Sequence, residues 1–259
     1  MKYKMSSVHP DAVIGENVTI GPFVTIDKNV VIGDNTYIYP NAVILEGARI
    51  GRNCQIFPGA VISAVPQDLK FQGEETTCEI GDNTTIRECA TVNRGTIAKG
   101  KTVVGNNCLL MAYSHVAHDC VLKDHVIVGN AVQLAGEVEV DDYAILSGGT
   151  LVHQFSKIGK HAMVQGGSKL GKDVPPYIMA GREPISYSGV NIVGLRRRGF
   201  TNEQIATIQE IYRLIYQSGM NNTTAVKHIE IHVPEGLEKS EIINFITNSQ
   251  RGILRGYLG

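Results

Sequence analysis

The chain has 259 residues, of which 43% are hydrophobic and 19% are charged, so it can bury a core and is not a disordered chain. Its formal net charge is −1, which excludes the strongly basic composition of general nucleic-acid or membrane-surface binders. Because the sequence opens without a secretory signal and contains no apolar run of about 18 residues, we expect a cytoplasmic protein without a membrane span.

The cysteines predict neither a metal cluster nor a disulfide framework. Their number is odd, and no C-x-x-C pair occurs in the sequence. Reduced thiols in a cytosolic protein are the simplest interpretation of these five residues, which are Cys54, Cys78, Cys89, Cys108 and Cys120.

A large aliphatic residue recurs at every sixth position from Val8 to Ile62 and again from Ile80 to Leu170, and only Ala98 departs from the rule in the second run. A helix with about 3.6 residues per turn would scatter these side chains around its surface. An ordinary half-buried strand would alternate with a period of two and end after a few residues. The repeat therefore predicts short strands separated by sharp corners.

Three such hexads form one triangular coil of about 18 residues, with the aliphatic side chains stacked inside. The position four residues after each aliphatic is usually small, as at Ala42 and Ala60, and a Gly, Asn or Asp commonly lies between. These residue types tolerate the left-handed backbone conformation that a tight corner needs. We therefore expect a mainly β protein, a parallel β-helix of about nine coils, although the period alone does not determine its hand.

One segment inside the repeat departs from it. Residues 64–79 are polar, lack the aliphatic phase and lie between coils that keep it. This predicts a loop that leaves the column, and a long loop on a rigid solenoid is more often functional than idle.

The end of the sequence changes from the hexad to a helical period. Thr201 and Gln204 form a capping box, apolar residues at helical spacing follow from Ile205, and Ser218-Gly219 ends the run. Further helices are expected over residues 223–231 and 240–254. The predicted organisation is thus a β-helix over residues 1–190 and a small α-helical domain over residues 191–259.

Three histidines are predicted to share one side of the column. His115 and His118 flank Val116, and His153 follows Val152, which lies 36 residues or two coils further on. Three interpretations are open at this point: surface histidines without a role, a zinc site of the kind found in hexapeptide-repeat carbonic anhydrases, and general-base catalysis. In the last of these, the neighbouring carboxylate of Asp119 would orient the imidazole ring. We favour this interpretation.

Five motifs occur in a fixed order along the sequence: QDLKFQGE (67–74), HVAHDC (115–120), VHQF (152–155), DVPPY (173–177) and NIVGLRRRGF (191–200). Together they make the sequence resemble the UDP-N-acetylglucosamine O-acyltransferase family, which begins lipid A synthesis. The resemblance implies a left-handed β-helix and transfer of an (R)-3-hydroxyacyl chain from acyl carrier protein to the 3-hydroxyl of UDP-N-acetylglucosamine.

The resemblance also implies a role for each matching residue. It makes His118 the general base, positioned by Asp119, and makes the Gly136 amide the donor that stabilises the oxyanion. The residues that it places around the substrate are Asp68 and Lys70 on the loop, His115 and His153 in the cleft, Gln154 near the nucleotide sugar, and Asn191, Arg197 and Arg198 on the nucleotide and its diphosphate.

The resemblance further implies a homotrimer whose acceptor site lies between neighbouring subunits, with no cofactor and no metal. Acyl carrier protein is acidic, so Arg196, Arg197 and Arg198 form a plausible docking patch. Gly166, near Met163, matches the position that measures the acyl chain in this family. A glycine there leaves room, so we expect a long acyl group.

The sequence departs from the family pattern at Glu137 and Asn93, where histidine is common, and at Val193, where glutamate is usual. Two related alternatives are a zinc-dependent carbonic-anhydrase-like enzyme and the UDP-3-O-acylglucosamine N-acyltransferase. The latter typically carries an extra domain before its repeats, whereas the hexads here begin at Val8. A non-enzymatic scaffold is the remaining class.

Overall fold

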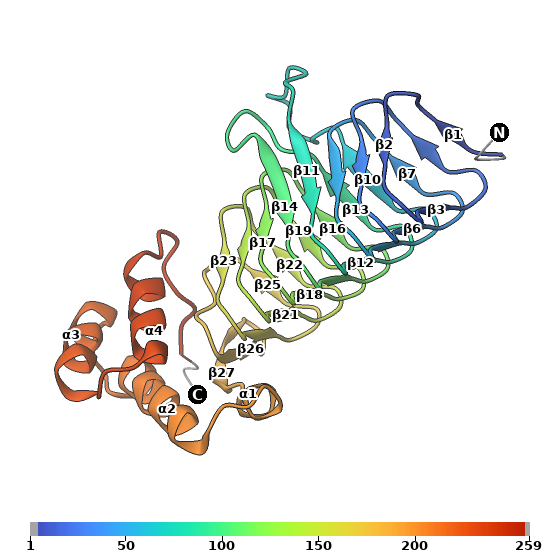
Figure 1. The fold of residues 1–259 in the computed structure, drawn as a ribbon. Helices are drawn as coiled ribbons and strands as arrows, with labels where there is room; N and C mark the ends of the chain where they lie inside the picture. The colour runs from blue at the N-terminus through green and yellow to red at the C-terminus, as the bar shows by residue number, and fades with distance from the viewer. Residues whose placement is uncertain (1–4, 257–259) are drawn as a thin grey trace.

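The protein is described by a computed structural model that covers residues 5–256, in which three sheets of parallel strands, one of them ending in an antiparallel pair, wrap into a three-sided column (Figure 1). Each coil contributes one short strand to each sheet, and the chain winds as a left-handed parallel β-helix. The mainly β fold and the hexad repeat predicted from the sequence are therefore confirmed.

The strands are grouped by sheet. Sheet A contains β1 (Ser7–Val8), β4 (Thr25–Ile26), β7 (Val43–Ile44), β10 (Val61–Ala64), β13 (Thr91–Asn93), β16 (His115–Val116), β19 (Gln133–Leu134), β22 (Leu151–Val152) and β25 (Lys169–Leu170). Sheet B contains β2 (Val13–Ile14), β5 (Val31–Ile32), β8 (Ala48–Ile50), β11 (Thr77–Ile80), β14 (Lys101–Val104), β17 (Val121–Leu122), β20 (Glu139–Val140) and β23 (Lys157–Ile158). Sheet C contains β3 (Thr19–Ile20), β6 (Tyr37–Ile38), β9 (Gln55–Ile56), β12 (Thr85–Ile86), β15 (Leu109–Leu110), β18 (Ile127–Val128), β21 (Ile145–Leu146), β24 (Met163–Val164), β26 (Ile178–Gly181) and β27 (Ser186–Val190).

The aliphatic residue of each hexad points into the column and forms its core. From Ile26 onward these side chains are at most 3% exposed, whereas Val8, Ile14 and Ile20 in the first coil are only half-buried. Within residues 5–256 the first coil has a neighbouring coil on one side only, so the described chain covers its inward side chains from one direction.

The chain turns at three corners, which we name A–B, B–C and C–A after the sheets that they join. The third residue after a core aliphatic adopts a positive φ, as in Asn17 (55°) and Asp119 (60°). Asparagine and aspartate tolerate this conformation better than most residues. The corner chemistry expected from the sequence is thus confirmed.

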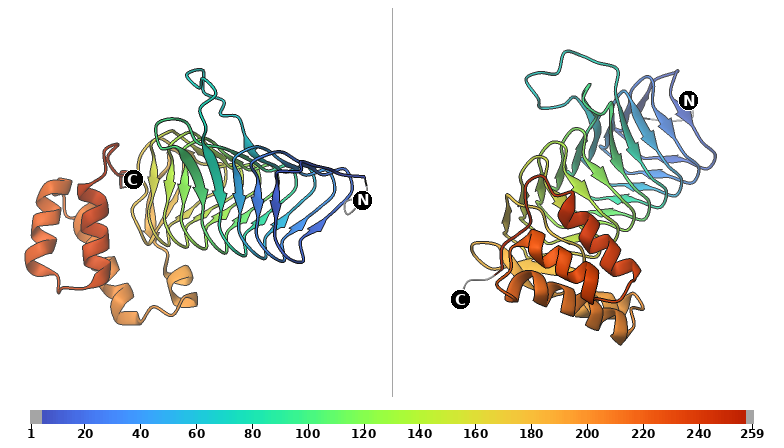
Figure 2. Two further views of the ribbon diagram at one scale, coloured as in Figure 1. Left: turned by 45° about the horizontal axis from the view of Figure 1, so that its top comes forward. Right: turned by 90° about the vertical axis from the view of Figure 1, so that its left-hand side faces the viewer.

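Two irregular excursions leave the column at the A–B corner. The longer one spans residues 65–76, between β10 and β11, and projects well clear of the coils in both views (Figure 2). It is shorter than the expected segment 64–79, because residues 77–79 belong to β11 and pair with β14. The second spans residues 94–100, between β13 and β14, where Ala98 breaks the hexad.

Helices close one end of the column. In the described residues they are α1 (Ile192–Arg197), α2 (Asn202–Gln217), α3 (Asn222–His232) and α4 (Leu237–Thr247). The capping box on α2 is present as predicted, and α3 agrees with the expected segment to within a residue. The last helix lies earlier than expected, since Asn248 caps α4 and the chain then returns to the column, where Ile253 bridges to Asp173. None of these helices combines the length and the apolar character that crossing a membrane requires.

Candidate active site

His118 and Asp119 form a hydrogen-bonded pair at the A–B corner that follows β16. The Asp119 side chain is fully buried, and its Oδ2 lies 2.8 Å from Nδ1 of His118. Thr96 donates to the same carboxylate twice, from its main-chain N–H to Oδ1 (2.9 Å) and from its hydroxyl to Oδ2 (2.6 Å). A buried carboxylate needs such donors to remain ionised. The contact between Asp119 and the imidazole, which the sequence predicted, is therefore present.

The pairing determines the tautomer of the imidazole. A carboxylate only accepts hydrogen bonds, so Nδ1 of His118 must donate and Nε2 is left with its lone pair when the ring is neutral. The side chain of His118 is 18% exposed. The ring is thus held by the fold while Nε2 can reach a substrate, as a general base must. Thr96 was not among the residues that the sequence singled out as functional.

Gly136 lies one coil above His118 at the same corner. A Cβ atom on Gly136 would lie 2.6 Å from both Cε1 and Nε2 of the His118 ring, a distance that real Cβ atoms essentially never show. No residue larger than glycine therefore fits next to the His118 ring in its present position. The Gly136 N–H has no hydrogen-bond acceptor within residues 5–256, whereas the next amide, that of Glu137, donates to the main-chain oxygen of His118. The corner thus places an unused donor beside the proposed base.

An open groove of about 670 Å³ runs along the outer face of sheet A beside this corner. The residues that line the groove form two rows along the column, because equivalent positions of successive coils stack on one another. One row consists of strand residues and the other of the residues just after each strand. The first row is His115, Gln133, Leu151 and Lys169, and the second includes Ala117, Ala135, His153 and Gly171. The prediction that His115 and His153 face the same side is therefore confirmed, and His118 lies one residue beyond Ala117.

The two groove histidines have different surroundings. His115 is hydrogen-bonded through Nδ1 to the Thr91 hydroxyl (2.7 Å), and burial, followed by the nearby His118, lowers the pKa of its imidazole. His153 is exposed, and its Nδ1 donates to the main-chain oxygen of Gln154 (3.1 Å). Gln154 is also exposed and stands one coil above Gly136 at the A–B corner.

The long excursion carries Asp68 and Lys70 out from the A–B corner, two coils before His118. The Asp68 carboxylate accepts from the main-chain N–H of Lys70 (3.0 Å), which forms a local turn. Lys70 is exposed, and the Leu69 side chain between them is completely exposed. Both predicted substrate residues thus arise at the same corner as the base, on a loop that extends away from its own column (Figure 2).

The predicted nucleotide residues lie elsewhere in the chain. Arg198 donates to the main-chain oxygen of Tyr143 at the B–C corner (3.2 Å), while Arg197 is exposed at the end of α1. Asn191 is 4% exposed, and its amide donates to the main-chain oxygen of His161 (3.0 Å) and caps α1 through Gly194. One chain therefore does not bring these residues to His118, and the side chain of Asn191 is already used in holding α1.

The residues expected along the acyl chain lie on the third face. Met163 is on the outer side of β24 in sheet C, and Gly166 is exposed at the C–A corner that follows. Neither lines the groove on sheet A.

The three departures from the family pattern have distinct surroundings. Glu137 is half-buried at the A–B corner, with a φ of 60°. Asn93 is buried and donates to the main-chain oxygens of Ala64 and Val65, so it anchors the start of the long excursion. Val193 is 62% exposed on α1.

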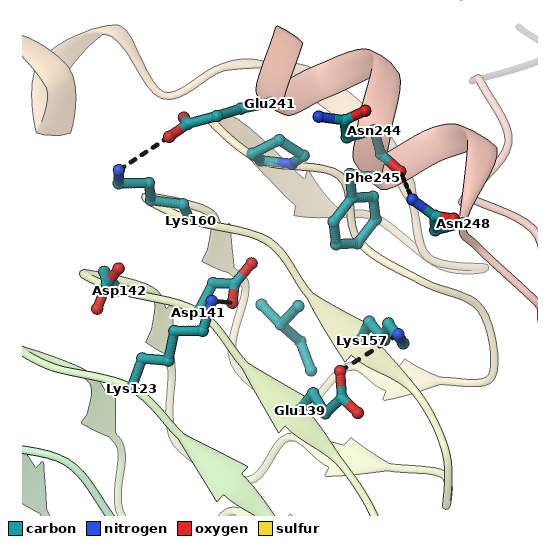
Figure 3. A pocket seen from close by; sticks show the side chains of 12 residues that line it. Lys123, Glu139, Asp141, Asp142, Lys157, Lys160, Glu241, Asn244, Phe245 and Asn248 are labelled. Carbon is teal, nitrogen blue, oxygen red and sulfur yellow. Dashed lines mark hydrogen bonds and ion pairs between the residues drawn. The ribbon is translucent and has the colours of Figure 1, made fainter. Parts of the chain in front are cut away.

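A second hollow, of about 380 Å³, lies between sheet B and α4 (Figure 3). Its lysines are paired with carboxylates, Lys157 with Glu139 (3.2 Å) and Lys160 with Glu241 (3.0 Å). Of these two ion pairs, the one between Lys160 and Glu241 links the column to α4. Within residues 5–256, no group of three or more His, Cys, Asp or Glu side chains is arranged to hold a metal ion.

Comparison with known proteins connects this geometry to a family. Residues 173–254 match a family model described as UDP-N-acetylglucosamine O-acyltransferase, domain 2, and residues 101–136 match one described as six bacterial transferase hexapeptide repeats. Residues 3–106 also match a model described as the GMPPB C-terminal domain.

Full-length relatives agree with the first of these descriptions. The protein named acyl-(acyl-carrier-protein)–UDP-N-acetylglucosamine O-acyltransferase in Chlorobaculum parvum is 56% identical over 255 residues, which cover 96% of this chain and 97% of that one. A crystal structure of a UDP-N-acetylglucosamine acyltransferase from Bacteroides fragilis has 58% identity and a TM-score of 0.97, and the match covers 98% of this chain and 100% of that one. The enzyme from Francisella novicida has 41% identity and a TM-score of 0.96, over 98% and 94% of the two chains. The resemblance seen in the five motifs is confirmed, and the chain belongs to the UDP-N-acetylglucosamine O-acyltransferase family.

Proposed function

We propose that this protein transfers an (R)-3-hydroxyacyl chain from acyl carrier protein to the 3-hydroxyl of UDP-N-acetylglucosamine, the first step of lipid A synthesis. The observation that carries the proposal is the contact at the A–B corner, where the imidazole of His118, held by the buried Asp119, lies against Gly136. The names of the relatives support the choice of both substrates.

In this reaction Nε2 of His118 removes the proton from the sugar 3-hydroxyl as its oxygen attacks the thioester carbonyl. The negative charge moves to the carbonyl oxygen, which accepts a hydrogen bond from the Gly136 N–H. When the tetrahedral intermediate collapses, the carbon–sulfur bond breaks and the imidazolium returns its proton to the leaving sulfur. Asp119 remains ionised throughout and stabilises the imidazolium.

We further propose that the site is completed in a homotrimer. Outward-facing residues of sheet C form an apolar stripe that no part of the described chain covers fully, namely Leu109, Ile127, Ile145, Met163 and Met179. The groove on sheet A is a second and different surface. If sheet C of one subunit packs against the sheet A side of the next subunit, closure around a threefold axis gives every such face a partner. It would also bring Arg198 of one copy towards His118 of the next.

The remaining residues then have roles in binding. Asp68 and Lys70 would contact the substrate from the excursion, His115 and His153 would line the cleft, and Gln154 would lie near the sugar. Arg197 and Arg198 would bind the diphosphate near Asn191, and Arg196 would add to a patch for the acidic carrier protein. Met163 and Gly166 would border a long acyl chain. The reaction needs no metal or cofactor, and we propose that it takes place in the cytoplasm.

The test is replacement of the base. His118→Ala should lower kcat by about two to four orders of magnitude, the usual contribution of a general base. His228→Ala, a histidine on α3 far from the A–B corner, serves as the control and should keep wild-type turnover. Thermal unfolding of both variants checks that the fold is intact. An unchanged rate in His118→Ala would refute the mechanism.

The same preparation separates the alternatives. A preference for UDP-3-O-acylglucosamine amine over UDP-N-acetylglucosamine as the acceptor would assign the protein to the N-acyltransferases instead. Stoichiometric zinc, with activity lost on chelation, would favour the carbonic-anhydrase-like enzyme. Failure of the protein to bind any UDP-sugar in calorimetry would point to a scaffold.

A further inference from the structure

The B–C corner changes its chemistry along the column. In the first coils the residue at positive φ is always asparagine, and in the last coils it is always aromatic. The asparagines are Asn17, Asn35, Asn53, Asn83 and Asn107, and the aromatic residues are His125, Tyr143, His161 and Tyr177. Asparagine adopts this backbone conformation more readily than a large ring does. Single aromatic residues take this position at the other corners, as at Phe23, Tyr113 and Phe155, but the B–C corner carries an unbroken run of them at one end of the column.

The four rings stack into a continuous column. The ring centroids of His125 and Tyr143 are 4.4 Å apart with planes 6° apart, and those of Tyr143 and His161 are 4.9 Å apart at 7°. Tyr177 continues the stack 5.7 Å beyond His161, and Phe200 meets the His161 ring edge-on at 5.1 Å. The segment after α1, which carries Phe200, therefore packs against this aromatic column.

Arg198 rests on the middle of this column. Its Cζ lies 5.3 Å from the centroid of the Tyr143 ring, and its Nη2 donates to the Tyr143 main-chain oxygen. Within residues 5–256 its other guanidinium nitrogens, Nε and Nη1, have no hydrogen-bond partner. The guanidinium is therefore fixed on one side by a ring and a carbonyl, and its remaining donors are available to a ligand.

We propose that Tyr143 is a positioning residue that holds the Arg198 guanidinium ready for the diphosphate of the acceptor. The inference rests on the proposed function, in which Arg198 binds that diphosphate, and adds the residue that sets its place. A free arginine side chain samples many rotamers, so fixing it on a ring before the ligand arrives removes an entropic cost from binding. The effect belongs to substrate binding and leaves the proton transfer at His118 unchanged.

The packing separates this role from simple support of the fold. His161 and Tyr177 are 4% and 1% exposed and hold Phe200 and α1 in place. Tyr143 is only half-buried, and within the described residues its ring touches Arg198 and the two flanking histidines. Removing the Tyr143 ring should therefore release the Arg198 side chain, while His161 and Tyr177 still hold α1 in place.

The experiment is a double-mutant cycle between the two residues. Tyr143→Leu removes the ring but retains the main-chain oxygen, and should raise the KM for UDP-N-acetylglucosamine roughly threefold to tenfold, the worth of one cation–π contact. Its kcat should stay within about twofold of wild type, since chemistry is untouched. In an Arg198→Lys background the same substitution should change KM by less than about twofold, because the contact between the planar guanidinium and the Tyr143 ring is already lost.

Tyr143→Phe is the conservative control, since it keeps the ring face and should restore a KM close to that of the wild type. Binding of UDP by calorimetry gives a second readout that does not require turnover. If wild-type protein binds UDP and Tyr143→Leu binds it equally well, the inference is wrong while the proposed function stands. If the two substitutions raise KM by independent factors, Tyr143 does not act through Arg198. Failure of wild-type protein to bind UDP would overturn both.

Discussion

At the scale of single residues, the site depends on one buried carboxylate. Asp119 is fully buried yet accepts hydrogen bonds from His118 and from two groups of Thr96. Removing a charge from water costs several kcal/mol unless such donors replace the solvent. The three donors therefore satisfy the buried carboxylate, and its bond to Nδ1 holds the imidazole in a single orientation, so the base is oriented before any substrate binds.

Gly136 provides a residue-scale prediction. Gly136→Ala would place a Cβ 2.6 Å from the His118 ring and force the ring to move. Since a displacement of about 1 Å can cost a hundredfold in rate, we expect kcat to fall by roughly two orders of magnitude. The φ of Gly136 lies outside the left-handed region, so alanine suits the backbone and the melting temperature should change little.

The matched control is Gly236→Ala, where the nearest atom would be 3.6 Å away and φ is −178°. This variant should have wild-type turnover. A Gly136→Ala enzyme with full activity would show that the close contact with His118 does not restrict the site.

The sequence could indicate part of this constellation. His118 and Asp119 are neighbours in the chain, so their pairing follows from adjacent positions at one corner. Thr96 is 23 residues from Asp119, and its contact depends on how the chain runs in the excursion over residues 94–100. No repeat or local pattern determines that path, which is why Thr96 emerges only from the three-dimensional structure.

At the scale of elements, the corners and coils follow directly from the repeat, and the exceptions are local. The six-residue helix α1 was not predicted, because Val193 and Gly194 are poor helix formers within a short segment. It forms because Asn191 caps it and Leu195 is fully buried. Tertiary contacts thus decide the structure where the intrinsic propensity is weak.

The aromatic column predicts how stability depends on pH. Burial, together with the charges of Arg198 and Lys160, lowers the pKa of His161 from 6.5 to about 4. The unfolded chain therefore binds a proton in this range that the folded chain does not, and stability should fall as the pH drops from 6.5 towards 4. The loss attributable to this ring is up to about 3 kcal/mol.

His161→Phe keeps a ring of similar size, and Asn191 still has the main-chain oxygen to bind. Urea unfolding at pH 7.5 and pH 4.5 should show a smaller acid-induced loss for this variant than for the wild type. His125→Phe, at the half-exposed end of the same column, should retain the wild-type loss. Equal losses in all three proteins would exclude His161 as the source.

At the scale of the whole molecule, a single chain separates groups that the proposed reaction needs together. His118 lies at the A–B corner and Arg198 at the B–C corner, with the whole of sheet B between them. A rigid column cannot bend to bring two of its own corners together. Copies of the chain can do so, because a threefold arrangement sets different corners side by side. The resemblance to the family implied a site between subunits, whereas the six-residue period by itself says nothing of which chain supplies each residue.

Ile127 gives a test of this assembly. Ile127→Glu would place a charge in the middle of the apolar stripe on sheet C, where an interface cannot solvate it. If the proposed homotrimer forms through this stripe, sedimentation should change from trimer to monomer. Transferase activity should fall by at least about a hundredfold, because the proposed site would lose the residues that the neighbouring subunit supplies. Val103→Glu makes the same change on the outward side of sheet B and should leave both properties unaffected. A trimeric Ile127→Glu protein would contradict the proposed interface.

The half-buried first coil has a consequence for where the molecule opens. Helices lie at one end of the column, whereas at the other end Val8, Ile14 and Ile20 are only half-buried in the described part of the chain. Each coil is stabilised mainly by its neighbours, so we expect thermal opening to begin at these less buried coils and to advance one turn at a time. Amide protons in the early turns should therefore exchange with solvent sooner than those around β16, and the catalytic corner can stay ordered while the opposite end frays.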